Sequence, residues 1–263
     1  MDILQIHKGE EMAAYSSWCF RKSLMLILLF LLTQMYARRT HASQFKQQYC
    51  GIELAGEMSL PVRERLQSTL RLISGIELSG EITPLHKVIF GASSSESYCE
   101  YLNKRLSGIR ILNKLATPWA NAQYHFETKE MLVSQKSVLQ ADQAQLILLI
   151  FHEAAHADSP NHVICPARVA DPFSTDGKSE RSKLGGMKEC DQSYRGAHGV
   201  SIVVGANMAS SCANCPALLK ASLLEHAAGL LIYAIPDVAA QSTLATDIGS
   251  IVKCSFSGFL RCE

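Results

Sequence analysis

Three histidines and one glutamate lie close together near the middle of the chain. Residues 152–156 read His-Glu-Ala-Ala-His, and His162 follows six residues after His156. On a helix, residues four apart share a face, so His152 and His156 can each give one ring nitrogen to a single metal ion. Glu153 points about 100° round the helix from His152, where it can reach a water on that ion without binding the ion itself. The spacing therefore predicts a metal-dependent hydrolytic site.

An apolar run precedes this motif and is expected to hold it in place. Leu146, Leu149 and Ile150 are the residues that would anchor the helix in the core and keep the ligands rigid. Ser137 or Asp142 can cap the start of this helix. The chain therefore predicts a helical mount for the two histidines.

The stretch resembles the zincin metallopeptidases, whose active-site helix carries HExxH beside an edge strand that aligns a peptide substrate. His162 takes the position of the third histidine in the metzincin pattern HExxHxxGxxH. The resemblance implies a Zn²⁺ site held by His152, His156 and His162, with a Met-turn beneath the metal. The sequence departs from the pattern at Ser159, which replaces the metzincin glycine, although the proline that follows would also end the helix.

Two further features of the resemblance are less closely matched. For the Met-turn, Met187 lies in turn-forming sequence after two glycines, whereas Met208 has the setting of a core methionine on a helix. In the gluzincin arrangement the third ligand is a glutamate on a later helix, and Glu225 is the best-placed candidate. The companion aspartate of that arrangement would fall at Gly229, so His162 is favoured over Glu225.

Such a site implies a reaction. Zinc with three protein ligands keeps a position for water and lowers the pKa of that water to about 7. Glu153 would take its proton, and the resulting hydroxide would attack a peptide carbonyl. An oxyanion needs a further donor, for which Tyr194, Arg195 and His198 are candidates because they flank a predicted loop-to-helix junction. The expected activity is that of an exported zinc metallopeptidase acting on peptide or protein substrates.

Two other functions stay open. One is a disulfide-stabilised zinc-binding protein without turnover, in which Asp158 or Cys165 would supply a fourth ligand and close the site. The other is a zinc amidase acting on a substrate that is not a peptide.

The N-terminus has the features of an export signal. Arg21 and Lys22 precede nine apolar residues, Leu24 to Leu32, a helical length of about 14 Å that is too short for a bilayer core of about 30 Å. Cleavage is expected after Thr40-His41-Ala42, with an uncleaved membrane anchor as the alternative. Residues 1–42 are therefore interpreted as the signal and residues 43–263 as one catalytic domain that is secreted or periplasmic. Apart from this segment no stable membrane span is expected.

Eight cysteines follow the signal, an even number that is typical of a disulfide framework in an oxidising compartment. Cys165 with Cys190 and Cys254 with Cys262 are plausible local closures. A CxxC sequence at Cys212 is interpreted as structural rather than redox-active, because no second CxxC accompanies it. The eight candidates are Cys50, Cys99, Cys165, Cys190, Cys212, Cys215, Cys254 and Cys262.

The predicted fold is α+β and zincin-like, with a small mixed or antiparallel sheet on the HExxH helix, further C-terminal helices and disulfides. Helices are expected over 61–73, 96–106, 197–211 and 216–234, a strand over 109–112, and a hairpin from 123–127 and 131–134. The polar, glycine-rich segment 166–195 is expected to be a surface loop or lid.

Charge limits the partners. Residues 1–42 hold five of the 25 Lys/Arg and three of the 24 Asp/Glu, which leaves 20 basic and 21 acidic residues in the exported part. A near-neutral surface without a basic cluster argues against a nucleic-acid partner. The oligomeric state has no signature in the sequence.

Overall fold

The structure, a computed structural model, describes residues 50–79, 82–91, 95–112, 121–159, 162–170, 179–181, 185–234 and 246. These residues belong to one compact unit, Gln47–Glu263. The predicted signal, 1–42, and the last two cysteines, Cys254 and Cys262, lie outside the described residues. The described part is a mixed α+β fold.

A four-stranded mixed sheet forms one layer, in the order β1-β2-β4-β3. Its strands are β1 (Glu53–Ala55), β2 (Gly108–Leu112), β3 (Ala122–His125) and β4 (Glu130–Ser134). β1, β2 and β4 run parallel, whereas β3 pairs antiparallel with β4 and ends the sheet. The β3–β4 pair confirms the predicted hairpin, and the alternation of side chains along β4 buries Met131 and Val133.

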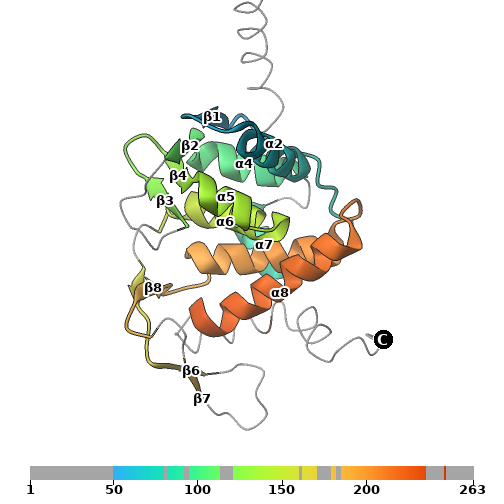
Figure 1. Cartoon of the computed structure of the whole chain (residues 1–263). Helices are drawn as coiled ribbons and strands as arrows, with labels where there is room; N and C mark the ends of the chain where they lie inside the picture. The colour runs from blue at the N-terminus through green and yellow to red at the C-terminus, as the bar shows by residue number, and fades with distance from the viewer. Residues whose placement is uncertain are drawn as a thin grey trace, which may run out of the picture. The chain divides into compact units, whose positions relative to one another are not determined.

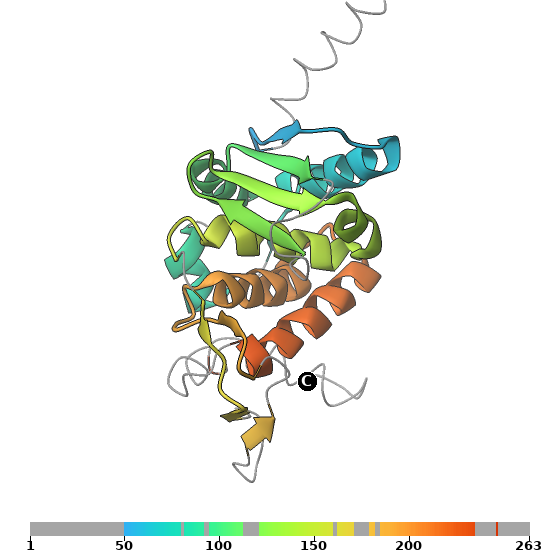
Figure 2. The same cartoon turned by 60° about the vertical axis from the view of Figure 1, so that its left-hand side comes forward.

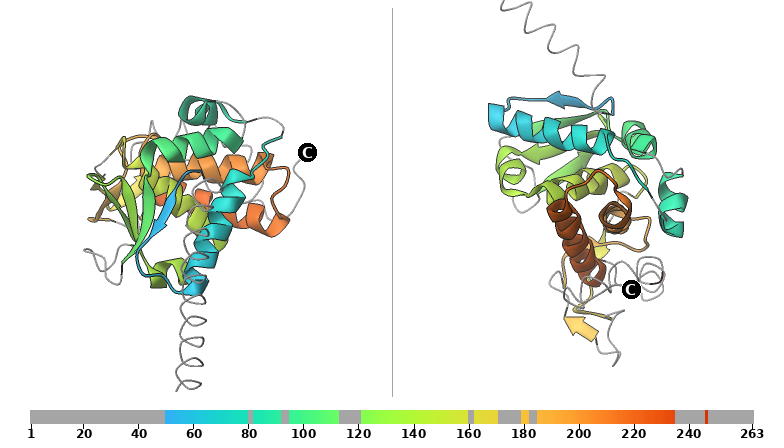
Figure 3. Two further views of the ribbon diagram at one scale, coloured as in Figure 1. Left: turned by 90° about the horizontal axis from the view of Figure 1, so that it is seen from above. Right: turned by 90° about the vertical axis from the view of Figure 1, so that its right-hand side faces the viewer.

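Seven helices are described: α2 (Leu60–Ser74), α3 (Pro84–Phe90), α4 (Ser95–Arg105), α5 (Gln135–Gln140), α6 (Gln143–Ala155), α7 (Ala197–Ser211) and α8 (Ala217–Ala234). α6 lies between the sheet on one side and α7 with α8 on the other (Figures 1 and 2). The right-hand view of Figure 3 places α8 in front, packed along α7. α6 is thus the central helix of the unit.

The sequence of α6 explains its place. Asp142 and Gln145 form a capping box at its N-terminus, with the Asp142 side chain accepting from the Gln145 N–H at 2.7 Å. Leu146 and Ile150 are fully buried and Leu149 partly, so the expected anchors face the core. Phe151 packs edge-on against the rings of Phe90 and Tyr98 and also lies near Tyr101; all four rings are buried. Each such side chain contributes about 1.5–3 kcal/mol by leaving water.

α7 is buried along almost its whole length and runs antiparallel to α6. The Ser201 hydroxyl donates to the carbonyl of Leu148 at 3.1 Å. A Cβ at Gly205 would lie 3.0 Å from the Leu223 carbonyl oxygen of α8 and 3.3 Å from Leu148 of α6. The three helices meet at this glycine, so their close packing depends on the missing side chain.

The prediction for segment 166–195 is wrong in part. Its described residues include β6 (Arg168–Ala170), β7 (Ser179–Arg181) and β8 (Lys188–Cys190). β6 pairs with β7, and β8 pairs with β5 (Val163–Ile164), both antiparallel. These strands have two or three residues each, too few to show a hydrophobic alternation in sequence. Figure 1 shows both pairs on the side where the chain enters α7.

Three disulfides link the described elements: Cys50–Cys99, Cys165–Cys190 and Cys212–Cys215. The second joins the residue that follows β5 to the last residue of β8 and is one of the two local closures expected above. They indicate folding in an oxidising compartment, as expected of an exported protein. Within the described part of the chain, no helix combines the length and the apolar character that crossing a bilayer requires.

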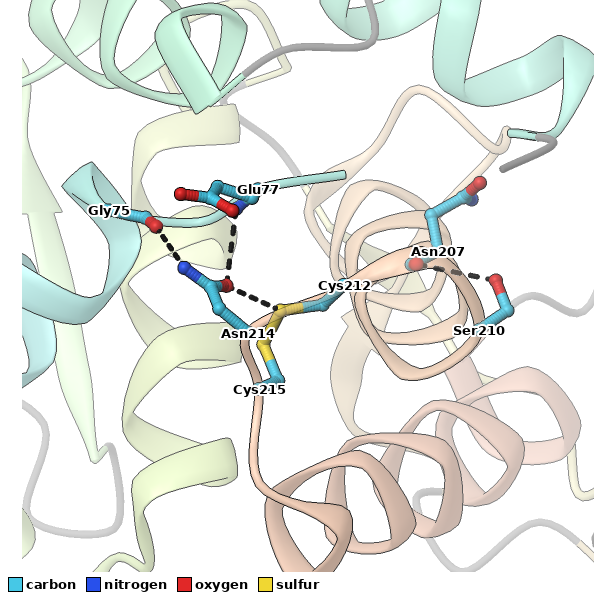
Figure 4. Close-up of a disulfide and its surroundings, with 7 residues drawn as sticks. All are labelled: Gly75, Glu77, Asn207, Ser210, Cys212, Asn214 and Cys215. Atoms are coloured by element: carbon cyan, nitrogen blue, oxygen red, sulfur yellow. Dashed lines mark hydrogen bonds between the residues drawn. A yellow bond between two sulfur atoms is a disulfide. The ribbon is translucent and has the colours of Figure 1, made fainter. Parts of the chain in front are cut away.

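The CxxC turn is fastened to the segment that follows α2. In Figure 4 the Asn214 amide donates to the carbonyl of Gly75 at 2.6 Å and accepts from the N–H of Glu77 at 3.2 Å. The Ala213 N–H also donates to the carbonyl of Glu77, at 2.7 Å. The turn between Cys212 and Cys215 therefore joins the α7–α8 connection to the segment after α2, which is the structural role expected of this CxxC sequence.

Candidate metal centre

His152, His156 and His162 come together at the C-terminal end of α6. The ring centroids of His152 and His156 are 5.0 Å apart, and those of His156 and His162 are 4.6 Å apart. Each residue offers one ligand atom, and these atoms lie within 4.8 Å of one another. Two nitrogens on one zinc ion are at most about 4.2 Å apart, so small side-chain rotations would bring all three onto one ion. The cluster is one that could hold a metal.

Hydrogen bonds decide which nitrogen each ring offers. His156 Nδ1 lies 3.1 Å from the carbonyl oxygen of Ser159, and His162 Nδ1 lies 3.0 Å from Oδ1 of Asp191. A carbonyl or an ionised carboxylate can only accept, so both Nδ1 atoms donate. A neutral imidazole then has its lone pair on Nε2, the form that binds a metal. Ser159, the departure from the metzincin glycine, supplies one of these acceptors through its backbone.

Asp191 lies beside His162 and belongs to a second possible metal-binding group, but no sequence pattern predicted a role for it. It is 3% exposed, and its Oδ2 accepts from the backbone N–H groups of His198 at 2.6 Å and Gly199 at 3.1 Å. These N–H groups belong to the first turn of α7, where a negative charge is stabilised. A Cβ at Gly196 would lie 2.4 Å from the Asp191 carboxyl carbon, so the glycine makes room for the carboxylate.

The disulfide Cys165–Cys190 brackets the same pair of residues. Cys165 lies three residues after His162, and Cys190 directly precedes Asp191. In the β5–β8 pair, Val163 is the partner of Cys190. The disulfide and the strand pairing therefore hold the histidine beside the carboxylate that orients it, and they fix both relative to α7.

His198 is a fourth histidine of the cluster. It was expected to be an oxyanion donor; its ring lies 4.4 Å from that of His152 and 5.1 Å from that of His162, measured between centroids. Its Nε2 lies 2.7 Å from the carbonyl oxygen of Glu189 and therefore donates. His198 Nδ1 is buried and has no hydrogen-bond partner. His198 also forms a second possible metal-binding group with His162 and Asp191.

Electrostatics favours neutral rings. Burial lowers the pKa of His198 to about 4, against the opposing effect of the Asp191 charge. Burial and the neighbouring imidazoles of His198, His156 and His162 hold the pKa of His152 well below its ordinary value. Burial also lowers the pKa of His156, against a hydrogen bond to the Ser159 carbonyl. At neutral pH the rings of His152, His156 and His198 are therefore neutral, and each keeps one nitrogen lone pair that a cation can bind.

Glu153 directly follows His152 on α6 and is buried. It is 4% exposed, and its Oε2 has no hydrogen-bond partner. Burial raises the pKa of Glu153 to about 8, a backbone hydrogen bond with Tyr124 of β3 opposes this rise, and the charge of Glu189 adds to it. A carboxyl group with a pKa close to neutrality can both take and return a proton, which is what a general base and acid requires.

Other residues named from the sequence lie elsewhere. Glu225 is in neither metal-binding group of the described residues. The next residue on α8, His226, bonds Asp142 at 2.9 Å. Asp142 lies at the N-terminus of α6, about 15 Å along that helix from His152, so Glu225 is at the opposite end of α6 from the histidines. The structure therefore brings His162, and not Glu225, to the pair of histidines.

Both fourth ligands suggested for a closed site have other partners. The Asp158 carboxylate pairs with the guanidinium of Arg105, with Nε 2.9 Å from Oδ2, and Cys165 is in its disulfide. Tyr194 and Arg195 precede α7, where the guanidinium lies 5.9 Å from the Tyr194 ring centroid; their role as oxyanion donors stays a prediction. Met208 is fully buried on α7, whereas Met187 is 42% exposed.

The donor set fits a transition metal. Imidazole nitrogens suit zinc, copper, iron and nickel, whereas calcium and magnesium prefer oxygen. Two buried polar atoms, Nδ1 of His198 and Oε2 of Glu153, have no hydrogen-bond partner and are therefore free to bind a ligand. Comparison of the chain with family models, curated proteins and solved structures found no match.

Proposed function

We propose that this protein is an exported zinc-dependent metallopeptidase in which Glu153 is the general base. The observation that carries the proposal is the convergence of three histidines from a helix end and the segment after it, together with a buried glutamate that has a free oxygen and directly follows the first histidine in sequence. His152, His156 and His162 would hold the zinc ion. When bound, the ion supplies charge that acidifies a water and polarises the scissile carbonyl.

Glu153 has the setting of a proton carrier. It would take the proton of the attacking water and return it to the leaving amine, so that the peptide bond is replaced by a carboxyl group and an amine. Desolvation makes its carboxyl group a stronger base than an exposed glutamate. Because it follows His152 directly, the helix fixes its distance from the ion.

The edge strand gives the substrate a place. β3 ends the described sheet, and Glu153 is hydrogen-bonded to the backbone of Tyr124 in that strand. An extended peptide that paired with β3 would therefore pass the general base. This placement supports a peptide substrate over a compact small molecule.

The test compares the wild type with Glu153→Gln, a variant that keeps the shape of the side chain and cannot accept a proton. We expect both proteins to bind one equivalent of zinc, and we expect only the wild type to cleave peptides from a broad library. Glu64→Gln is the matched control, because it makes the same substitution at an exposed glutamate on α2. Cleavage that persists in Glu153→Gln would exclude the proposed role of Glu153.

One observation favours a second candidate function, a closed zinc site without turnover. The fourth imidazole, His198, has a free nitrogen close to the same cluster, and zinc with four protein ligands is typical of structural sites. A wild type that binds zinc tightly and cleaves no peptide would support this candidate. A zinc amidase remains the third prediction, and a screen of non-peptide amides separates it from a peptidase.

A further inference from the structure

We propose that His198 binds the ion through Nδ1 as a fourth imidazole ligand, so that four histidines hold the metal in the substrate-free protein. The proposal rests on the zinc site of the proposed function and adds a ligand from α7 to those from α6 and His162. It replaces the expectation that His198 donates to an oxyanion.

The tautomer of His198 is the first argument. Its Nε2 must donate to the Glu189 carbonyl oxygen at 2.7 Å, so a neutral ring has a lone pair and no hydrogen on Nδ1. Such a nitrogen can accept or coordinate, and it cannot donate to an oxyanion. The side chain is 8% exposed, and no described group bonds this nitrogen.

The position of the ring is the second argument. The ring centroid of His198 lies 4.4 Å from that of His152 and 5.1 Å from that of His162. Its ligand atom lies within 4.8 Å of those of His162 and Asp191, so a side-chain rotation would have to bring Nδ1 onto the ion shared by His152 and His156. Its backbone N–H is bonded to Asp191, the residue that also orients His162. One carboxylate therefore sets the positions of two histidines of the cluster.

A fourth imidazole has a consequence for turnover. Zinc can expand to five ligands during reaction, so four histidines leave room for one oxygen if the coordination rises. The ion would also join α6 to α7, the two helices that carry His152 and His198. We expect zinc to protect α7 amides from hydrogen exchange in the wild type and to do so less in a variant without His198.

The experiment counts imidazoles and measures affinity. X-ray absorption of the zinc-loaded wild type should show four imidazoles, and His198→Ala should show three with one oxygen. By chelator competition, His198→Ala should bind zinc more than about 100-fold more weakly, beyond the range of about 10–100-fold that loss of an outer-shell partner causes. Asp191→Asn is the outer-shell comparison. His226→Ala, at the other end of α6 where His226 bonds Asp142 at 2.9 Å, should leave the affinity unchanged.

His198→Gln guards against a folding defect, since its amide can still donate to the Glu189 carbonyl. Three imidazoles in the wild type, or unchanged affinity in folded His198 variants, would overturn the proposal. The two proposals fail separately. Four imidazoles without peptide cleavage would refute the peptidase and keep His198 as a ligand, whereas three imidazoles with Glu153-dependent cleavage would do the reverse.

Discussion

Removal of the Asp191 carboxylate tests how the centre is organised. Its oxygens accept three hydrogen bonds: from His162 Nδ1 at 3.0 Å, from the His198 N–H at 2.6 Å and from the Gly199 N–H at 3.1 Å. Asp191→Ala would leave these donors without an acceptor, at about 1–3 kcal/mol for each buried group. Such costs do not add fully, because neighbours share the relaxation. We expect the free energy of unfolding of the metal-free protein to fall by about 3–5 kcal/mol.

The assay is urea unfolding followed by circular dichroism, with a chelator present so that metal binding does not contribute. Asp191→Asn keeps a carbonyl oxygen as acceptor, so its loss should be smaller, about 1–2 kcal/mol. Asp158→Ala is the control, because its carboxylate is 60% exposed and its ion pair with Arg105 should be worth less than about 1 kcal/mol. If Asp191→Ala unfolds within about 1 kcal/mol of the wild type, the carboxylate does not organise the cluster.

Three further changes have defined outcomes. Burial raises the pKa of Glu153 from 4.5 to about 8, so the stability that its protonated form contributes is complete below about pH 4.5 and is lost as pH rises through about 8. Over this range the free energy of unfolding of the metal-free wild type should fall by about 3–5 kcal/mol relative to that of Glu153→Gln, as urea unfolding at each pH would measure. Replacing Cys165 and Cys190 by alanine opens a loop with a sequence separation of 25, so the free energy of unfolding should fall by about 3–4 kcal/mol and zinc should bind more weakly, by calorimetry. Phe151→Ala removes a fully buried ring from the aromatic cluster, and thermal unfolding should report a loss of about 3–5 kcal/mol.

The parts of the fold that the sequence predicts are those with a long local pattern. The helices α2, α4, α7 and α8 lie within a residue or so of the predicted ranges, because each has enough turns to show its period. The β3–β4 hairpin was also predicted, since two alternating strands flank a polar turn. β1 and the pairs β5–β8 and β6–β7 were not predicted, because strands of two or three residues depend on partners distant in sequence.

The same distinction applies to the site. His152, Glu153 and His156 are set by one helix, so their spacing alone indicates the chemistry. Asp191 gave no such signal, because its role depends on contacts made across the fold: His162 lies 29 residues before it, and its other partners are backbone groups at the start of α7. A usable signal for Asp191 would have been its place directly after a cysteine and five residues before Gly196, the N-cap of a helix whose first turn can bind a carboxylate.

His198 shows why residue type does not determine the role of a histidine. From sequence it was predicted only as an oxyanion donor at a loop-to-helix junction, although an imidazole can either donate a hydrogen bond or coordinate a metal. What separates the two roles is the ring nitrogen that carries hydrogen, and that is fixed by the carbonyl of Glu189, nine residues earlier in β8. β8 takes this position because it pairs with β5 and because Cys190 is bonded to Cys165, the residue that follows β5. The strand pairing that orients His162 through Asp191 therefore also leaves His198 Nδ1 as the bare nitrogen, so reduction of this disulfide should disturb both histidines together.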